Sequence, residues 1–269
     1  MKNLIKSPLN YVGGKYKLLP QLLPLFPDDI HTFVDLFCGG ANVSVNIKAQ
    51  RIIATDKQPE VIDFLNACIK LESKEMVDKI YGLIDKYNLS KTNKEGYLKL
   101  RNDYNRGNKT WDMFYALVCY SFNNQIRFNS KGEFNMPFGK NRSSFNPTLK
   151  QKFIEFVDTI KTIHIKFLCK DFRELKPTKL ANNDFVYCDP LYLITCASYN
   201  ESGGWGISDE EDLLNLLDEL NDKGIRFALS NVLESKGNSN DLLKKWAKRY
   251  RIHKIEAGYG NCNYQRRIK

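Results

Sequence analysis

The stretch that decides the fold is FVDLFCGGAN, from Phe33 to Asn42. It begins with an apolar run interrupted by one aspartate, as in a strand that is buried on both faces. Gly39 and Gly40 then permit a tight turn in which the backbone can approach a ligand closely. A strand, a glycine turn and a helix in this order predict the opening of a parallel α/β sheet.

The rest of the chain extends this pattern on both sides. Residues 32–70 predict a strand, the glycine turn, a helix, a second strand and a second helix. The second helix begins near Pro59, a residue that favours the first helical turn. The expected strands are 32–37, 51–55, 164–168, 185–188 and 225–229, and the later helices are 208–221 and 241–251. Ser208 and Glu211 have the spacing of a capping box at a helix start.

The middle of the chain breaks this alternation. Residues 71–163 are rich in Lys, Asn, Tyr and Phe, and the tetrapeptide NSKG at 129–132 separates two short runs as a hairpin turn would. We therefore predict an α/β fold with a Rossmann-like, doubly wound sheet. Residues 1–70 and 164–269 form this sheet domain, and residues 71–163 form an inserted helical and β-hairpin domain.

Composition sets the broad class of protein. The chain has 269 residues, 42% of them hydrophobic, and a formal net charge of +10. No apolar run is long enough to span a bilayer, and the first residues do not form a signal peptide. We expect a cytoplasmic protein without membrane contact. The positive charge favours a polyanionic partner, although a basic chain can also simply be well solvated.

The cysteines give no sign of a disulfide framework or a metal site. They are odd in number, and none form a C-x-x-C pair. We expect them to be reduced, several as small core residues, and we expect no bound metal. They lie at Cys38, Cys68, Cys119, Cys169, Cys188, Cys196 and Cys262.

The glycine turn also suggests a cofactor. Asp56 follows the second strand, where a carboxylate can accept hydrogen bonds from ribose hydroxyls. Both the dinucleotide pattern G-x-G-x-x-G and the triphosphate pattern G-x-x-x-x-G-K-[ST] are absent. A nucleoside cofactor without phosphates, S-adenosyl-L-methionine above all, fits this combination. The alternative is an ordinary α/β turn without a ligand.

A second candidate cofactor element is NYVGGK, residues 10–15. Its two glycines could wrap the edge of a cofactor, and Tyr11 could stack on a sulfonium or lie beside an adenine. The alternative is an N-terminal turn with a tyrosine in the core.

The candidate catalytic segment is FVYCDPLY, residues 185–192. An apolar strand here brings Asp189, Pro190 and Tyr192 to the edge of the sheet where ligands bind. The Asp189 carboxylate and the Pro190 carbonyl can each accept one N–H of an exocyclic amine, which frees the nitrogen lone pair for attack on a methyl group. Tyr192 can stack on a base turned out of a duplex. The alternative is a turn-forming Asp-Pro at a strand end.

Taken together, these segments resemble the Dam-type family of adenine-N6 DNA methyltransferases. The resemblance covers nearly the whole chain, and the motifs occur in the family's α order. They are NYVGGK, FVDLFCGGANVSV, TDKQPEVIDFLN, IRFNSKGEFNMPFG, CKDF, VYCDPLY, FALSN and YGNCNYQ.

The resemblance implies a role for each matching residue. Residues 71–163 match the target-recognition region, where Arg127 would read a guanine, Phe122 and Asn123 would enter the duplex, and Pro137 would contact a thymine methyl. From the residues alone, Arg127 would be a solvated hairpin residue and Phe122 a core residue. The implied catalytic residues are Asp189, Pro190 and Tyr192. The implied residues for S-adenosyl-L-methionine are Tyr11, Gly13, Lys15, Asp35, Phe37, Gly39, Gly40, Asp56, Asp171, Phe172 and Asp189.

The sequence departs from the family pattern at two places. The catalytic tetrad reads D-P-L-Y instead of D-P-P-Y, so Leu191 replaces a proline of fixed φ. The chain also ends soon after YGNCNYQ, before a further strand that is usual in the family. The alternative to an active enzyme is therefore a catalytically impaired relative that binds cofactor and DNA. A methyltransferase for cytosine N4 or for RNA is a third hypothesis.

The expected partner is double-stranded DNA. The resemblance also suggests a restriction–modification system with a cognate restriction endonuclease acting on the same site. We expect a monomer. The recognition sequence is not predicted.

Overall fold

The computed structural model describes residues 4–11, 13–107, 109–195 and 204–256. These residues form a five-stranded sheet in the order β3-β2-β1-β4-β5, with every neighbouring pair parallel. The strands are β1 (Thr32–Asp35), β2 (Arg51–Asp56), β3 (Ile165–Cys169), β4 (Phe185–Cys188) and β5 (Arg226–Leu229). The strand order reverses between β1 and β4, which makes this pair the topological switch point of a doubly wound sheet. The predicted Rossmann-like fold is confirmed.

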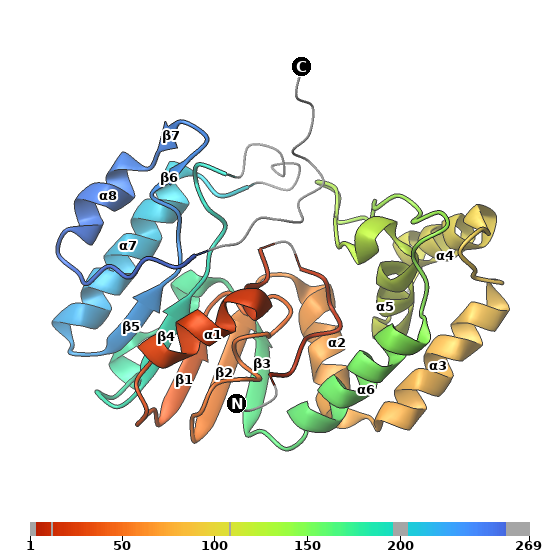
Figure 1. Ribbon diagram of the computed structural model, residues 1–269, viewed down its shortest axis with the longest axis horizontal. Helices are drawn as coiled ribbons and strands as arrows, with labels where there is room; N and C mark the ends of the chain where they lie inside the picture. Colours follow the sequence, from red (N-terminus) through yellow and green to blue (C-terminus); the bar gives the residue numbers. More distant parts are fainter. Residues whose placement is uncertain (1–3, 12, 108, 196–203, 257–269) are drawn as a thin grey trace.

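Helices and short 3-10 turns connect these strands (Figure 1). Before β1 lie η1 (Lys15–Leu18), α1 (Leu19–Leu22) and η2 (Leu23–Leu25). Between β2 and β3 lie α2 (Pro59–Lys70), α3 (Ser73–Lys86), α4 (Lys94–Arg106), α5 (Trp111–Tyr120), η3 (Phe122–Asn124) and α6 (Pro147–Ile160). The remaining elements are η4 (Phe172–Glu174), η5 (Pro177–Lys179), α7 (Ile207–Asp222), β6 (Glu234–Ser235), β7 (Asn238–Ser239) and α8 (Asp241–Ala247).

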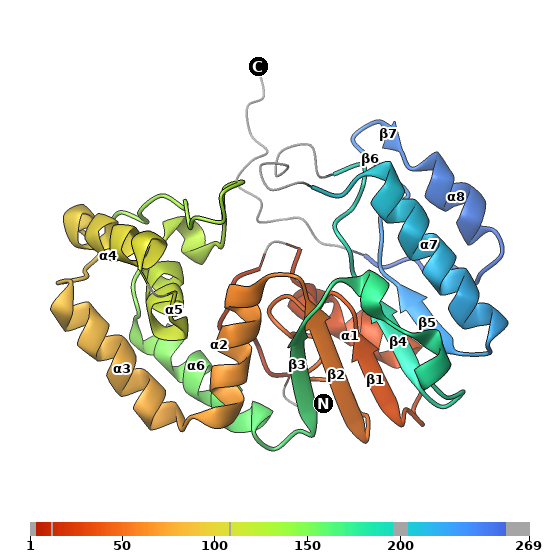
Figure 2. The same cartoon turned by 180° about the vertical axis from the view of Figure 1, so that it is seen from behind.

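The alternation of side chains along the strands creates two hydrophobic layers. Phe33 and Phe185 pack on one face of the sheet, in a core that includes residues of α2, α5 and α6. Val34 and Val186 point to the other face, where the leucines of α7 and part of α8 cover them. Figures 1 and 2 show α7 and α8 at the β5 side of the sheet and the helices α3 to α6 beyond β3. Buried strands between two helical layers are typical of parallel sheets.

The helical insert shares its core with the sheet domain. Tyr115 of α5 stacks on Phe64 of α2 with ring centroids 4.9 Å apart, and Phe153 of α6 lies at 4.9 Å from the same tyrosine. The hydrophobic core is therefore continuous across the predicted domain boundary at residue 70. The division of the chain into residues 1–70 with 164–269 and residues 71–163 stays a prediction.

The helix expected directly after the glycine turn does not form. Residues 42–46 make successive turns instead, and Ala41 before them has a positive φ of 61°. The Asn42 side chain accepts a hydrogen bond from the Ser7 amide, and the Asn46 side chain accepts one from the Ile5 amide. These bonds to the N-terminal segment, together with the β-branched Val43 and Val45, override the helical tendency of the stretch.

Several other boundaries differ from the expectation. Helix α7 begins at Ile207, and the Asp209 carboxylate accepts from the Gly206 amide at 2.8 Å, so the predicted capping pair of Ser208 and Glu211 is wrong. Strand β1 ends at Asp35, two residues early, because the chain turns toward the glycines. Helix α8 ends at Ala247, four residues before the expected end. The YGNCNYQ motif, Cys196 and Cys262 lie outside the described residues.

Candidate functional site

The carboxyl edge of the sheet brings the predicted site residues together at the switch point. Asp189 follows β4, Asp56 ends β2, and Gly39 lies in the turn after β1. The Cys38 amide donates to the Thr55 carbonyl at 2.8 Å, and the Leu36 amide donates to the Tyr187 carbonyl at 3.0 Å. These bonds hold the glycine turn between the ends of β2 and β4.

The Asp189 carboxylate is held from two sides. The Lys15 ammonium lies 2.6 Å from Asp189 Oδ1, and the Tyr192 hydroxyl donates to the same oxygen at 3.1 Å. The Lys15 nitrogen also donates to the Gly13 carbonyl and lies 5.3 Å from the centre of the Tyr192 ring. The exposed fractions of the Lys15 and Asp189 side chains are only 7% and 16%. Burial raises the pKa of Asp189 above its ordinary value, and the Lys15 ammonium opposes this rise.

Asp56 and Gly39 form a second polar group at this edge. The Gly39 amide donates to Asp56 Oδ2 at 2.9 Å, and the Gln58 amide donates to Oδ1 at 2.9 Å. Gly39 has a positive φ of 46°, and a Cβ at this position would lie 3.3 Å from the Tyr11 ring. The predicted aromatic residue of the N-terminal motif therefore packs directly on the predicted glycine turn. A carboxylate has lone pairs for further donors, so Asp56 can still accept a ribose hydroxyl.

Asp35 carries a buried oxygen that has no partner among the described residues. Its side chain is fully enclosed, Oδ2 accepts from the Ser44 hydroxyl at 2.6 Å, and Oδ1 has no hydrogen bond. Burial raises the pKa of Asp35 to about 7, and the nearby Asp189 charge adds to the rise, whereas the Ser44 hydroxyl and the Phe37 backbone amide oppose it. An unsatisfied buried carboxylate oxygen is costly and indicates a missing donor, such as an ammonium group of a ligand.

Three aromatic rings form a wall beside the glycine turn. Phe37, Phe172 and Trp205 lie with ring centroids 5.4 to 5.6 Å apart. The sequence predicted Phe37 and Phe172 but not Trp205, which precedes α7. The indole nitrogen of Trp205 donates to the buried Glu210 at 2.5 Å, so α7 fixes the orientation of this ring. A wall of flat rings suits the adenine ring of a nucleoside cofactor.

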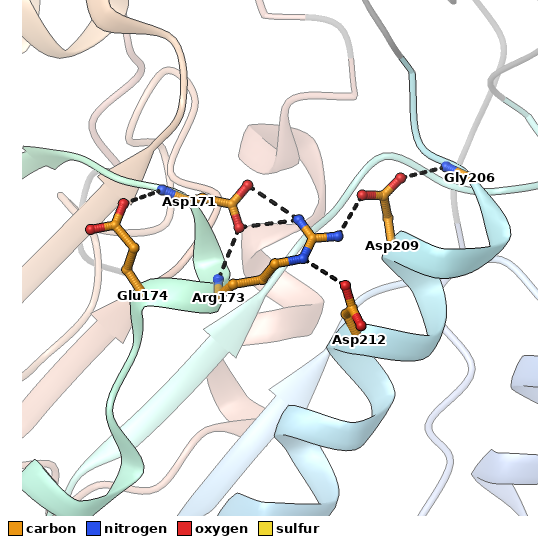
Figure 3. A network of polar contacts seen from close by, with 6 residues as sticks. All are labelled: Asp171, Arg173, Glu174, Gly206, Asp209 and Asp212. Atoms are coloured by element: carbon orange, nitrogen blue, oxygen red, sulfur yellow. Dashed lines mark hydrogen bonds and ion pairs between the residues drawn. The ribbon is translucent and has the colours of Figure 1, made fainter.

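Asp171 takes part in an ion network that the sequence did not predict (Figure 3). Its carboxylate accepts from the backbone and from the guanidinium of Arg173, and the same guanidinium reaches Asp209 and Asp212 of α7 at 2.6 Å each. The guanidinium also lies 4.5 Å from the centre of the Phe172 ring. Arg173 therefore ties the candidate adenine-binding turn to the start of α7. The sequence motif CKDF ends at Phe172, so it did not include Arg173.

The four predicted DNA-contacting residues lie in the loops between α5 and α6. Arg127 donates through Nε and Nη2 to the side chain and backbone of Asn135 across the hairpin. Phe122 is partly buried, its amide donates to the carbonyl of the exposed Pro137, and Asn123 is exposed with a positive φ of 55°. Antiparallel bridges between Phe128 and Phe134 and between Ser121 and Phe138 flank the predicted NSKG turn.

The candidate recognition loop touches the N-terminal cofactor motif. The Asn10 side chain donates to the Asn123 carbonyl at 2.8 Å, and Asn10 forms a parallel bridge with Gln125. Figure 1 shows these loops on the same side of the molecule as the carboxyl ends of the strands. The loop expected to meet DNA and the edge expected to hold the cofactor are thus in direct contact.

A Rossmann-like sheet with an acidic strand end, a glycine turn and an Asp-Pro-x-Tyr segment at its switch point defines a methyltransferase class of α/β enzyme. The family model described as D12 class N6 adenine-specific DNA methyltransferase matches residues 11–261. The chain belongs to this family, whose chemistry implies a methyl donor. The match gives no support to the hypothesis of a catalytically impaired relative, and it favours adenine N6 over cytosine N4 or RNA.

Three curated relatives are modification enzymes. The chain is 48% identical to Type II methyltransferase M.FokI of Planomicrobium okeanokoites over 97% of its length, and 43% identical to Modification methylase StsI of Streptococcus sanguinis over 100%. It is 32% identical to Modification methylase LlaI of Lactococcus lactis over 97%. The chain spans 41% to 42% of the length of these relatives.

No helix in the described part of the chain is both long and apolar enough to cross a membrane. Within the same residues, no group of His, Cys, Asp and Glu side chains could hold a metal ion.

Proposed function

We propose that this chain transfers a methyl group from S-adenosyl-L-methionine to the N6 of adenine in a short duplex sequence. The observation that carries the proposal is the arrangement of Asp189. This carboxylate follows β4 at the switch point, is largely enclosed, and has both described contacts on Oδ1. Oδ2 and the Pro190 carbonyl are then the acceptors for the two N6–H groups of a flipped adenine.

The residues present fit the cofactor. The unpartnered Asp35 oxygen matches an ammonium donor, the Asp56 carboxylate matches ribose hydroxyls, and the wall of Phe37, Phe172 and Trp205 matches an adenine. When bound, S-adenosyl-L-methionine supplies an electrophilic methyl group. Asp189 and Pro190 hold the amine so that its lone pair points at that methyl, and Tyr192 offers its ring to the base. Lys15 keeps Asp189 ionised and oriented.

The resemblance to modification methylases extends the proposal to a biological role. We infer that the chain modifies DNA as part of a restriction–modification system, with a cognate endonuclease that acts on the same sequence. Its target would be read by Arg127, with Phe122, Asn123 and Pro137 beside the flipped base. We also propose that the chain acts in the cytoplasm as a monomer.

The testing experiment is transfer of labelled methyl from S-adenosyl-L-methionine to unmethylated duplex DNA, followed by nucleoside analysis and mapping of the modified sites. We expect N6-methyladenine at one short sequence. Asp189→Ala should abolish transfer while DNA binding persists, because the change removes one acceptor for the flipped adenine and leaves the predicted contacts of residues 122–137 to the duplex in place. A product other than N6-methyladenine, or unchanged turnover of Asp189→Ala, contradicts the proposal.

The restriction–modification role has its own test. DNA from a host that expresses the chain should resist an endonuclease that cuts the mapped sequence. Cleavage at the unmodified rate, despite confirmed methylation, argues against this role.

A further inference from the structure

Lys109 lies between the hairpin that carries Arg127 and helix α2, which packs on the sheet. It stands between α4 and α5, and its ammonium donates to the carbonyl of Gly132 in the hairpin turn. The same ammonium lies 5.9 Å from the ring centre of Phe128, the residue next to Arg127. One charged group thus lies against both the hairpin turn and the ring of Phe128.

The other partner of Lys109 belongs to the first turn of α2. Its ammonium lies 3.2 Å from Oε1 of Glu60, whose side chain is only 9% exposed. The Gln58 side chain donates to the second oxygen of Glu60. Removing the ammonium would leave the negative charge of Glu60 buried without a cationic partner, which is costly. Glu60 therefore holds the Lys109 ammonium beside it.

Gln58 continues the connection to the cofactor edge. Its backbone amide donates to one oxygen of Asp56 at 2.9 Å, and the Gly39 amide donates to the other oxygen at 2.9 Å. A contiguous series of polar contacts therefore runs from the hairpin turn to the glycine turn. Its members in order are Gly132, Lys109, Glu60, Gln58, Asp56 and Gly39.

We propose that Lys109 is a positioning residue that couples cofactor binding to DNA recognition. The inference rests on the proposed function, because it takes Asp56 as the acid that holds the cofactor. A ligand that fixes Asp56 and Gln58 also fixes Glu60, and through Lys109 it fixes the hairpin that carries Arg127. Ordering the hairpin before DNA arrives lowers the entropy lost on DNA binding, so each ligand strengthens the binding of the other.

The hairpin has other anchors, so loss of Lys109 leaves it folded. The Asn105 side chain accepts from the Phe134 amide at 2.8 Å and donates to the Phe134 carbonyl at 3.0 Å. The Tyr97 hydroxyl donates to the Met136 carbonyl at 2.8 Å. These bonds join the hairpin to α4 and do not reach the cofactor edge. A Lys109 variant therefore tests coupling separately from folding.

The experiment measures the dissociation constant of a duplex that carries the mapped methylation site, with and without saturating S-adenosylhomocysteine. The wild type should bind the duplex about 5-fold or more tightly when this unreactive cofactor product is present. In Lys109→Met the ratio should fall to within about 2-fold of unity, while the affinity for S-adenosylhomocysteine alone stays near that of the wild type. Lys109→Arg, which keeps a cationic donor, should retain most of the ratio.

Lys161→Met is the matched control. Lys161 pairs with Glu72 across the same helical region, at a contact between residues flanking α6 and α3 that does not reach the hairpin. This variant should keep the wild-type ratio. Glu60→Gln should lower the ratio, and the double variant with Lys109→Met should lose no more than either single one.

Two outcomes overturn the inference. One is a wild-type ratio of unity, and the other is a Lys109→Met variant that keeps the wild-type ratio. Failure of the proposed function is a different result, because it appears as the lack of N6-methyladenine in the transfer experiment. A chain that methylates adenine but shows no Lys109-dependent coupling refutes only the present inference.

Discussion

Lys15 and Asp189 form an enclosed ion pair, with the ammonium 2.6 Å from Oδ1, although one residue precedes the first strand and the other follows the fourth. The pair joins the N-terminal glycine motif to the candidate catalytic strand end. The Lys15 ammonium and the Tyr192 hydroxyl both contact Oδ1 of Asp189. The Lys15 ammonium favours the charged form of the carboxylate, and we propose that the other carboxylate oxygen meets the substrate amine.

The first prediction concerns the pH dependence of methyl transfer in Lys15→Met. Burial raises the pKa of Asp189 and Lys15 lowers it, so removal of Lys15 raises this pKa further. Transfer needs the ionised carboxylate and is lost as the pH falls through its pKa, so the acid limb should move to higher pH. We also expect kcat at neutral pH to fall on the order of 100-fold, because the carboxylate loses a positioning contact. Single-turnover rates across pH measure both effects.

The control for this prediction is Lys17→Met, which removes an exposed lysine from the same short helix η1. Its pH profile should match that of the wild type. An acid limb that stays in place in Lys15→Met would show that Lys15 does not set the ionisation of Asp189.

The second prediction is that Leu191→Pro changes kcat by less than about 3-fold, far below the 100-fold effect of a misplaced catalytic group. Leu191 is 48% exposed, and the carboxylate of the preceding Asp189 is anchored by Lys15 and Tyr192. The fixed φ of a proline therefore adds little to a geometry that is already held from two sides. Steady-state rates with saturating cofactor and DNA provide the measurement, and a gain of tenfold or more would contradict the tolerance of Leu191.

The third prediction concerns the affinity for S-adenosylhomocysteine and Asp35. Burial raises the pKa of Asp35 to about 7, so the free protein holds a proton there at lower pH. An ammonium ligand favours the ionised carboxylate, so its binding releases that proton. The dissociation constant should then rise about tenfold for each pH unit below 7 and level off above it.

Titration calorimetry at several pH values tests this expectation, with Asp35→Asn as the comparison. The variant cannot release a proton from this position and should bind more weakly at pH 8, with a flatter pH dependence. An unchanged slope in Asp35→Asn would assign the proton to another group, and Asp56 would be the next candidate because burial also raises its pKa.

The sequence was sufficient to predict an element where its local pattern agrees with the tertiary structure. Phe185–Cys188 is a short apolar run ended by Asp-Pro, and it forms β4 with the predicted bounds. The residues at its end are placed by the strand, so Asp189 could be predicted without knowing its partners. The expected helix after Gly40 failed because side chains of the 41–46 segment bond to the N-terminal segment, a contact that no local pattern encodes.

The residues that the sequence missed act through contacts between distant segments. Trp205 joins the aromatic wall only because α7 packs on the sheet and Glu210 orients the indole. Arg173 gains its role from Asp209 and Asp212, which α7 presents to it. A tryptophan just before a helix and an arginine in a short 3-10 turn have no distinctive local pattern, so only the packing of α7 reveals these residues.

The last prediction concerns the reading of the target sequence by Arg127. Its Nε and Nη2 donate to Asn135, which holds the guanidinium across the hairpin and leaves the edge formed by Nη1 and the second Nη2 hydrogen for a base. That edge has the two parallel donors that recognise guanine O6 and N7. Arg127→Ala should therefore reduce discrimination at one base pair of the mapped site by about 1–3 kcal/mol, measured as kcat/KM on duplexes substituted at each position.

A loss of general DNA affinity has to be separated from this loss of specificity. Arg106→Ala removes an exposed arginine from the end of α4 and serves as the charge-matched control. A phosphate-contacting arginine weakens all duplexes alike and lowers the salt dependence of binding, whereas a base-reading arginine changes the preference at one position. An Arg127→Ala enzyme that keeps the wild-type preference at every position would remove Arg127 from target recognition and leave Asn135 as a purely structural partner within the hairpin.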